Sequence, residues 1–255
     1  MTKLEQIQNG FKVNRYRPFD PMRRPFKTET LRHVFDFAYG MTFGRQGEHR
    51  DHRTGGFQRR TNGQIFADTF QGKLAECAVC NLFFGLFHIN ISPDFEKYKL
   101  GKWDNYDVNV EGVRINIKST KSFGNLLLLE YADWDNNGVY LPNAESGEGN
   151  YDYFFLVRIE PYCTNLLESE RLLYSDNLQR DELLSLVLAK EWRYDYAGFV
   201  THEELVRDVI KEQQIIRQKD MLNGKTTMDA DNYYVQAGDM HIASEFKAFF
   251  EHNKS

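Results

Sequence analysis

Three polar residues of this 255-residue chain have the types and the spacing of a hydrolytic site: Asp107, Asn116 and Lys118. A strand-borne carboxylate can bind Mg²⁺ through oxygen. A lysine close by can orient or deprotonate a water molecule that attacks a phosphodiester. The metal ion then screens the charge that develops on the phosphate, and the lysine compensates charge on the incoming oxygen.

A predicted β-hairpin would bring these residues together. Apolar and polar residues alternate over Tyr106–Val110 and again over Val113–Lys118, which is the period of a half-buried strand. Glu111-Gly112 between them has the length and the glycine of a two-residue hairpin turn. In that register Val110 opposes Val113 and Asp107 opposes Asn116, so the three polar side chains share one face.

Hydrophobic periodicity predicts the elements around this hairpin. The strongest helix covers 67–88 and carries Glu76, the only acidic residue between Asp68 and Asp94. No linker divides the chain, so we expect one domain of mixed α and β type with an N-terminal elaboration. The other expected elements are an extended arm over 11–28, helices over 29–43, 178–191, 202–222 and up to Phe250, strands over 126–131 and 153–159, a short strand within 229–239, and loops over 44–65 and 138–151.

The hairpin and the preceding helix together resemble the core of the PD-(D/E)xK nuclease superfamily, to which most type II restriction endonucleases belong. Asp107 matches the aspartate of the pattern, Lys118 matches its lysine, and Glu76 matches the glutamate often found on a preceding helix. Two positions differ: Asn116 stands where the family has Asp or Glu, and Tyr106 replaces the motif's proline. An amide oxygen can ligate a metal but carries no charge, so metal affinity or turnover should be lower.

The resemblance implies a restriction-endonuclease-like core, with a central mixed sheet flanked by helices. It implies a Mg²⁺-dependent endonuclease that hydrolyses double-stranded DNA, with Mn²⁺ as a possible substitute and a homodimer as the expected assembly. Asp107, Glu76 and Asn116 would bind the metal, and Lys118 would position the water. By region, 1–65 would be a basic DNA-contacting arm, 66–160 the catalytic core, and 161–255 a helical and C-terminal part of the same domain.

The distribution of charge also suggests nucleic acid. The net charge of −5 divides into +7 over residues 1–60 and −12 over the remainder, and arginine predominates in the basic part. Arginine suits bidentate contacts to phosphate and guanine, although an Arg-rich solvated surface would look the same. The residues expected to contact DNA are Arg15, Arg17, Arg45, Arg53, Arg59, Arg60, Ser119 and Lys121, with the loops at 138–151 and 229–239 reaching around the duplex.

Other interpretations of these residues remain open. A structure-specific repair, recombination or phage nuclease would use the same site, and a catalytically inactive DNA-binding protein would explain Asn116. Glu76 could simply pair with Lys73 on its own helix. Cys77 and Cys80 form a Cys-x-x-Cys pair, but their place in mid-helix favours buried thiols over a zinc or redox site.

Several classes of protein are disfavoured. The chain has no apolar run approaching the ~20 residues of a membrane span, and its first residues lack a secretory signal. Three widely spaced cysteines do not form a disulfide framework. No nucleotide-cofactor fingerprint is present. We therefore expect a cytoplasmic protein that binds neither a membrane nor a nucleotide cofactor.

Overall fold

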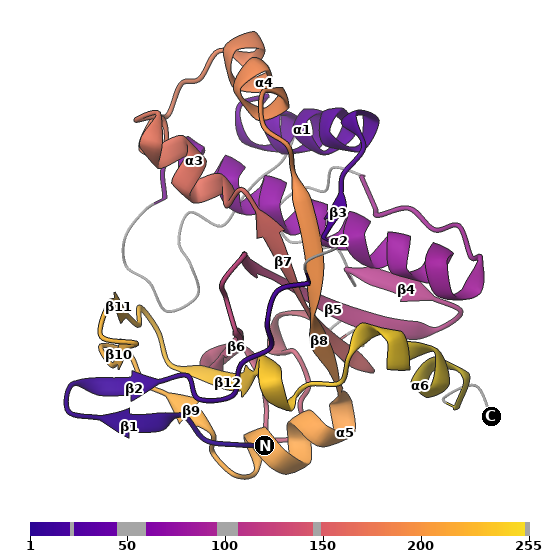
Figure 1. Cartoon of the computed structure of the whole chain (residues 1–255), viewed down its shortest axis with the longest axis vertical. Coiled ribbons are helices and arrows are strands. Elements are labelled where there is room, and N and C mark those ends of the chain that lie inside the picture. Colours follow the sequence, from indigo (N-terminus) through magenta and orange to yellow (C-terminus); the bar gives the residue numbers. More distant parts are fainter. Residues whose placement is uncertain (21–22, 45–59, 96–106, 145–148, 253–255) are drawn as a thin grey trace.

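The computed structural model describes residues 1–20, 23–44, 60–95, 107–144 and 149–252, and it has the mixed α+β fold that the sequence predicts (Figure 1). Its centre is a five-stranded sheet in the order β3-β8-β7-β5-β4. β5 and β7 are parallel, and the other neighbours are antiparallel. The strands are β3 (Arg24–Pro25), β4 (Val108–Val110), β5 (Val113–Lys121), β7 (Tyr153–Glu160) and β8 (Arg193–Thr201). Because β7 is covered on both faces, its sequence is apolar almost throughout instead of alternating.

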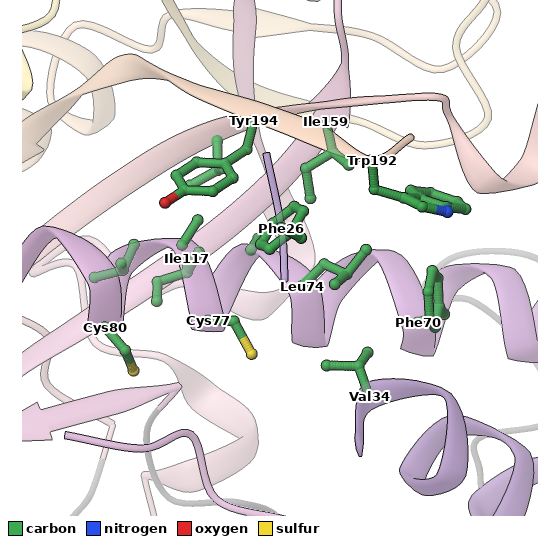
Figure 2. Close-up of a cluster of buried hydrophobic side chains, with 14 of the residues drawn as sticks. Phe26, Val34, Phe70, Leu74, Cys77, Cys80, Ile117, Ile159, Trp192 and Tyr194 are labelled. Carbon is green, nitrogen blue, oxygen red and sulfur yellow. The ribbon is translucent and has the colours of Figure 1, made fainter. Parts of the chain in front are cut away.

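Helices cover one face of this sheet (Figure 1). They are α1 (Thr28–Thr42), α2 (Asn62–Phe87), α3 (Cys163–Ser169), α4 (Arg180–Leu188) and α6 (Phe246–His252). α2 starts before the predicted residue 67, because Thr61 and Gln64 form a capping box. In the core, Phe70 of α2 packs edge-on against Trp192, with ring centroids 5.0 Å apart, and Leu74 lies near Val34 of α1 (Figure 2). In the part of the chain that is described, no helix combines the length and the apolar character needed to cross a bilayer.

A second, smaller sheet and a short helix cover the opposite face (Figure 1). The sheet has the order β6-β12-β9, from β6 (Leu126–Glu130), β12 (Asn232–Gln236) and β9 (Ile215–Ile216). The helix α5 (His202–Leu205) continues as a π-helical turn over Val206–Ile210. The central mixed sheet is thus covered by helices on one face and mainly by strands on the other; a restriction-endonuclease-like core stays a prediction.

The predicted helix over 202–222 is wrong beyond Ile210. Gln213 has a φ of 49°, and the chain then enters β9, which pairs with β12. Gln214, a buried residue directly before β9, donates a hydrogen bond from its side-chain amide to the carbonyl of Tyr234 in β12. Tertiary pairing therefore overrides the local helical pattern at this point.

The N-terminal segment is joined to the C-terminal part of the chain by a third sheet. Its order is β1-β2-β10-β11, from β1 (Glu5–Ile7), β2 (Gly10–Lys12), β10 (Met221–Leu222) and β11 (Thr226–Thr227). β2 and β10 run parallel, although more than 200 residues separate them in the sequence. Figure 1 shows this sheet beside the layer of β6, β9 and β12.

Most of the other predicted elements are present. The predictions over 29–43, 126–131, 153–159 and 178–191 correspond to α1, β6, β7 and α4, and the C-terminal helix α6 ends two residues after Phe250. The strand expected within 229–239 is β12, but it is buried, so this segment is not the exposed loop expected to reach around DNA. In 138–151 the described part contains a 3-10 turn at Leu141–Asn143. β8 and α3 were not predicted.

A buried ion pair holds the N-terminal segment against the central sheet. Arg158 of β7 and Asp195 of β8 lie opposite each other, and both side chains are 2% exposed. Arg158 Nε donates to Asp195 Oδ1 at 2.7 Å, and its other nitrogens donate to the carbonyls of Arg17 and Pro18. Asp195 in turn accepts from the backbone N–H of Asp20 at 2.9 Å. The ion pair therefore anchors the backbone of residues 17–20 to the central sheet.

We expect Asp195→Asn to destabilise the fold by about 3–5 kcal/mol, because it leaves the Arg158 guanidinium buried without a counter-ion. The free energy of unfolding from urea titration measures this change. Asp36→Asn is the matched control, because the Asp36–Arg180 pair is about half exposed, and its loss should change stability by less than about 1 kcal/mol. Equal effects of the two substitutions would contradict the role assigned to the buried pair.

The start of α5 depends on one carboxylate. Glu204 accepts hydrogen bonds from the backbone N–H and the hydroxyl of Thr201, both at 3.0 Å, and its other oxygen lies 2.7 Å from His241 Nε2. Burial raises the pKa of Glu204, but the Thr201 N–H and His241 together lower it below its ordinary value. A lowered pKa in the folded state means that folding stabilises the ionised form of Glu204 relative to its protonated form.

Because its pKa is lower when folded, Glu204 stabilises the protein above the ordinary Glu pKa of about 4.3, and this stabilisation is lost as the pH falls through the folded-state pKa. We expect Glu204→Gln to lower stability by about 1 kcal/mol at neutral pH, with the difference from wild type disappearing in acid. Melting temperatures across pH 3–8 measure it, with the exposed Glu203→Gln as control. A difference that does not change with pH would contradict the prediction.

Candidate active site

The hairpin that carries the candidate site has the predicted register. Val110 pairs with Val113, and Val108 pairs with Ile115. Glu111 and Gly112 both have positive φ, 54° and 88°, as a type I′ turn requires, and the twist of that turn matches the twist of the two strands. The valine and isoleucine side chains of β4 and β5 enter the core beneath α2. Asn116 and Lys118, which alternate with them, therefore face the other way.

Asp107 directly precedes β4, the outermost strand of the central sheet among the described residues, where the ladder between β4 and β5 ends. Its Oδ2 accepts a hydrogen bond of 2.6 Å from the backbone N–H of Ile117. The carboxylate is thus fixed beside β5 and next to Lys118. Burial raises the pKa of Asp107, while Lys118, the Ile117 N–H and Lys73 oppose this increase. The structure therefore brings the acid and the amine of the predicted site into electrostatic range.

Asn116 is buried, and its side-chain oxygen is one of several buried polar atoms, with Gln71 Nε2 and Gln214 Oε1, that lack a hydrogen-bond partner among the described residues. The residue is 4% exposed, and Oδ1 has no hydrogen-bond partner among the described residues. A buried acceptor without a partner costs about 1–3 kcal/mol, and such atoms are rare in folded proteins. The oxygen therefore keeps an unused acceptor position, on the same strand face as Lys118.

Glu76 has a close partner on its own helix. Its Oε2 accepts a hydrogen bond of 2.6 Å from Lys73 Nζ, and both side chains are buried. Lys73 Nζ also donates to the carbonyl of Asp94 at 2.8 Å and lies over the Phe37 ring, 4.9 Å from its centroid. The pairing that the sequence left open is thus present. From α2, the charge of Lys73 opposes the increase that burial causes in the pKa of Asp107. The role of Glu76 as a metal ligand stays a prediction.

Oxygen atoms from Asp107 and Asn116 are the donors that this site offers to a metal. In the described parts of the chain, no three His, Cys, Asp or Glu residues are grouped so that they could hold a metal ion. Mg²⁺ is commonly held by one or two protein oxygens, with waters and substrate phosphate completing its shell. The donor set therefore suits an ion that binds together with its substrate.

The thiols of Cys77 and Cys80 are buried, as their position in mid-helix predicted. Burial is the main cause that raises both pKa values, that of Cys80 to about 12. Thiols with such pKa values stay protonated near neutral pH, and the thiolate is the form that binds zinc or exchanges disulfides. Figure 2 shows both side chains within the packed α2 core.

The residues predicted to contact DNA differ in what they do in the fold. Arg17 donates to the carbonyls of Ala237 and Met240, so it fastens the N-terminal segment. Arg15 pairs with Asp239 at 3.0 Å but stays half exposed, and Arg60 pairs with Asp68 at 3.1 Å. Ser119 and Lys121 are on β5, beyond Lys118. Arg45, Arg53 and Arg59 lie outside the described residues.

Comparison of the chain with protein-family models, with curated proteins and with solved structures found no match. The interpretation of the site therefore rests on its residues and their geometry.

We expect Asp107→Asn to keep or raise the melting temperature, because an amide oxygen can still accept from the Ile117 N–H while a buried charge is removed. Added Mg²⁺ should stabilise the wild type, by about 2.7 kcal/mol at roughly 100 times its Kd, and should not stabilise the variant. Thermal melts with and without MgCl₂ measure both effects.

The matched control is Asp181→Asn, which removes an almost fully exposed carboxylate and should leave the response to Mg²⁺ unchanged. If Asp107→Asn were stabilised by Mg²⁺ as much as the wild type, Asp107 would not be a ligand of the ion.

Proposed function

We propose that this protein is a Mg²⁺-dependent endonuclease that hydrolyses phosphodiester bonds of double-stranded DNA. One set of observations carries the proposal: the Asp107 carboxylate accepts from the Ile117 N–H and interacts electrostatically with Lys118, and Oδ1 of Asn116, on the same strand as Lys118, has no hydrogen-bond partner among the described residues. A metal-dependent phosphodiesterase needs oxygen ligands and a nearby cation in this arrangement.

Asp107 and Asn116 would hold the divalent ion. When bound, such an ion polarises the phosphate and lowers the pKa of a coordinated water. The buried oxygen of Asn116 fits this role, because it has no other partner among the described residues and a hard cation prefers oxygen. Mn²⁺ accepts the same carboxylate and carbonyl oxygens, so it should substitute for Mg²⁺.

Lys118 would position the attacking water. A charged ammonium has three N–H donors and no acceptor, so Nζ can orient a water by donating to its oxygen or can neutralise charge on the phosphate. Lys118 in turn opposes the increase that burial causes in the pKa of Asp107, so the two groups interact electrostatically. The residue therefore supplies a fixed positive charge at the point where negative charge develops during attack.

The finer proposal is a sequence-specific type II restriction enzyme of the cytoplasm, with the PD-(D/E)xK pattern in which asparagine replaces the acidic residue. The +7 charge of residues 1–60 supports a DNA partner. Such enzymes read palindromic sites as homodimers, because protein symmetry then matches DNA symmetry. Discrete bands from linear DNA would support this role, and cleavage confined to flaps, junctions or ends would favour the structure-specific alternative.

The wild type should nick or linearise a supercoiled plasmid in Mg²⁺, and Lys118→Ala should slow this by about 10²-fold or more. The matched control is Lys190→Ala, which removes an exposed lysine just after α4 and should cleave at the wild-type rate. Gel electrophoresis over time gives the rates.

Asn116→Asp tests, in the same assay, the position at which asparagine replaces an acidic residue. It adds a carboxylate to the donor set, so we expect cleavage at lower Mg²⁺ concentration than the wild type needs. Absence of cleavage by the wild type and by Asn116→Asp, in Mg²⁺ and in Mn²⁺, would overturn the proposed function. Unchanged cleavage by Lys118→Ala would remove the role assigned to the lysine.

A further inference from the structure

Lys73 of α2 is a buried lysine to which the proposed function assigns no role. Its side chain is 6% exposed, and Nζ donates to Glu76 Oε2 at 2.6 Å and to the carbonyl of Asp94 at 2.8 Å. The ammonium also lies over the rings of Phe37 and Phe95, 4.9 and 5.9 Å from their centroids. Burying an ammonium is costly unless it is paired, so these contacts are what keeps a charged lysine in the interior.

The same helix covers the strand to which Asp107 is anchored. α2 packs against β5, and Cys77, four residues after Lys73, belongs to the same buried cluster as Ile117 of β5 (Figure 2). Residues four apart lie on the same side of a helix. The backbone N–H of Ile117 is the donor that holds the Asp107 carboxylate, at 2.6 Å. Asp107 is therefore fixed to the part of β5 that packs beneath α2.

This hydrogen bond places the Asp107 carboxylate at the edge of the sheet. A backbone N–H of a strand points within the sheet, toward the position of a neighbouring strand, and not toward either face. A carboxylate bonded to it can therefore interact with charges from both faces. Lys118, on the face away from α2, and Lys73, from α2, both oppose the increase that burial causes in the pKa of Asp107.

The charges of these groups balance before any ion is bound. Two carboxylates, Asp107 and Glu76, are accompanied by two ammonium groups, Lys73 and Lys118. The affinity of an oxygen site for a divalent cation depends on how many charged ligands it offers. Lys73 occupies the Glu76 carboxylate and reduces the negative charge that attracts an ion to Asp107. In agreement with this, no three His, Cys, Asp or Glu residues in the described part of the chain are grouped to hold a metal ion.

We propose that Lys73 is a resident cation of the candidate site, which withholds Glu76 from the divalent ion and lowers the affinity of the ion for Asp107. The inference rests on the proposed function and adds the residue that controls metal loading. The ion is then bound tightly only when a DNA phosphate adds its own negative charge, since Mg²⁺ commonly completes its shell with substrate phosphate. Lys73 acts through the ligands of the ion, so it is a positioning residue.

Mn²⁺ binding to the DNA-free protein tests this inference without cleavage. Electron paramagnetic resonance measures the free ion at about pH 8, where carboxylates are ionised, and only the ion that Asp107→Asn loses is counted. A change of one unit charge beside a divalent ion should alter its affinity about tenfold or more at the effective dielectric constant of a protein site. We expect Lys73→Met to bind Mn²⁺ more tightly than the wild type, and Glu76→Gln to bind it more weakly.

Two further variants separate charge from packing. The double variant Lys73→Met/Glu76→Gln removes one charge of each sign, and Lys73→Arg keeps the positive charge, so both should bind Mn²⁺ with about the wild-type affinity. Lys247→Met is the matched control, because the Lys247–Glu251 pair on α6 is more than half exposed, and it should leave the affinity unchanged. Urea titration identifies the variants that fold. If Lys73→Met alone does not fold, Glu76→Gln and the double variant still decide the result.

A purely structural ion pair would give a different result. Both single substitutions break the same pair, so a structural role would shift the Mn²⁺ affinity of Lys73→Met and Glu76→Gln in the same direction. Shifts in the same direction, or wild-type affinity in both variants, would overturn the inference. Absence of Mn²⁺ binding at Asp107 in the wild type and in Lys73→Met would also overturn it.

The plasmid assay separates this inference from the proposed function. Cleavage that depends on Lys118, with Mn²⁺ affinities of Lys73→Met and Glu76→Gln that shift in the same direction, would keep the nuclease and reject the role of Lys73. Opposite shifts in these two variants, with no cleavage by the wild type under any metal, would keep the role of Lys73 and reject the nuclease.

Discussion

The register of one β-hairpin is the constraint on which the candidate site depends. Side chains alternate across a strand, so a slip of one residue between β4 and β5 would turn every polar group of the site into the core. The positive φ angles of Glu111 and Gly112 fix a two-residue turn, and the apolar residues on both sides of it fix the buried face. The turn and the burial pattern require the same register, which leaves Asn116 and Lys118 on the face away from α2.

The same edge of the central sheet contains two polar groups whose burial lowers the stability of the fold. Asp107 carries a pKa raised mainly by burial, and Asn116 keeps a buried oxygen without a partner in the described chain. Other buried polar groups are paired, as in Arg158 and Asp195, although Gln71 Nε2 and Gln214 Oε1 also lack a partner among the described residues. Local violations of this kind are expected at functional sites, which is consistent with the function proposed for Asp107 and Asn116.

The N-terminal segment contributes to the stability of the fold, which its positive charge alone does not predict. Its backbone is held by Arg158, and Arg17 fastens it to the carbonyls of Ala237 and Met240. Some of the arginines that make residues 1–60 basic therefore stabilise the fold. The segment also contacts the residues between β5 and β6, because the backbone N–H of Arg17 donates to Asn125 Oδ1 at 3.0 Å.

The features that depend on residues close together in the sequence could be predicted from the sequence alone. Alternation and a glycine turn gave the hairpin and its register, and apolar spacing gave α1 and α2. Only the tertiary structure decided the features that depend on distant partners. Ile215 and Ile216 form a strand because β12 lies beside them, and β8 is the partner of β7 across a separation of about 40 residues. The sequence offered Lys73 as one possible partner of Glu76, and the fold shows these two side chains paired and buried. A local sequence pattern indicates the preferred conformation of a segment and which of its faces is apolar. The element that packs against that face is determined by contacts between residues that are far apart in the sequence.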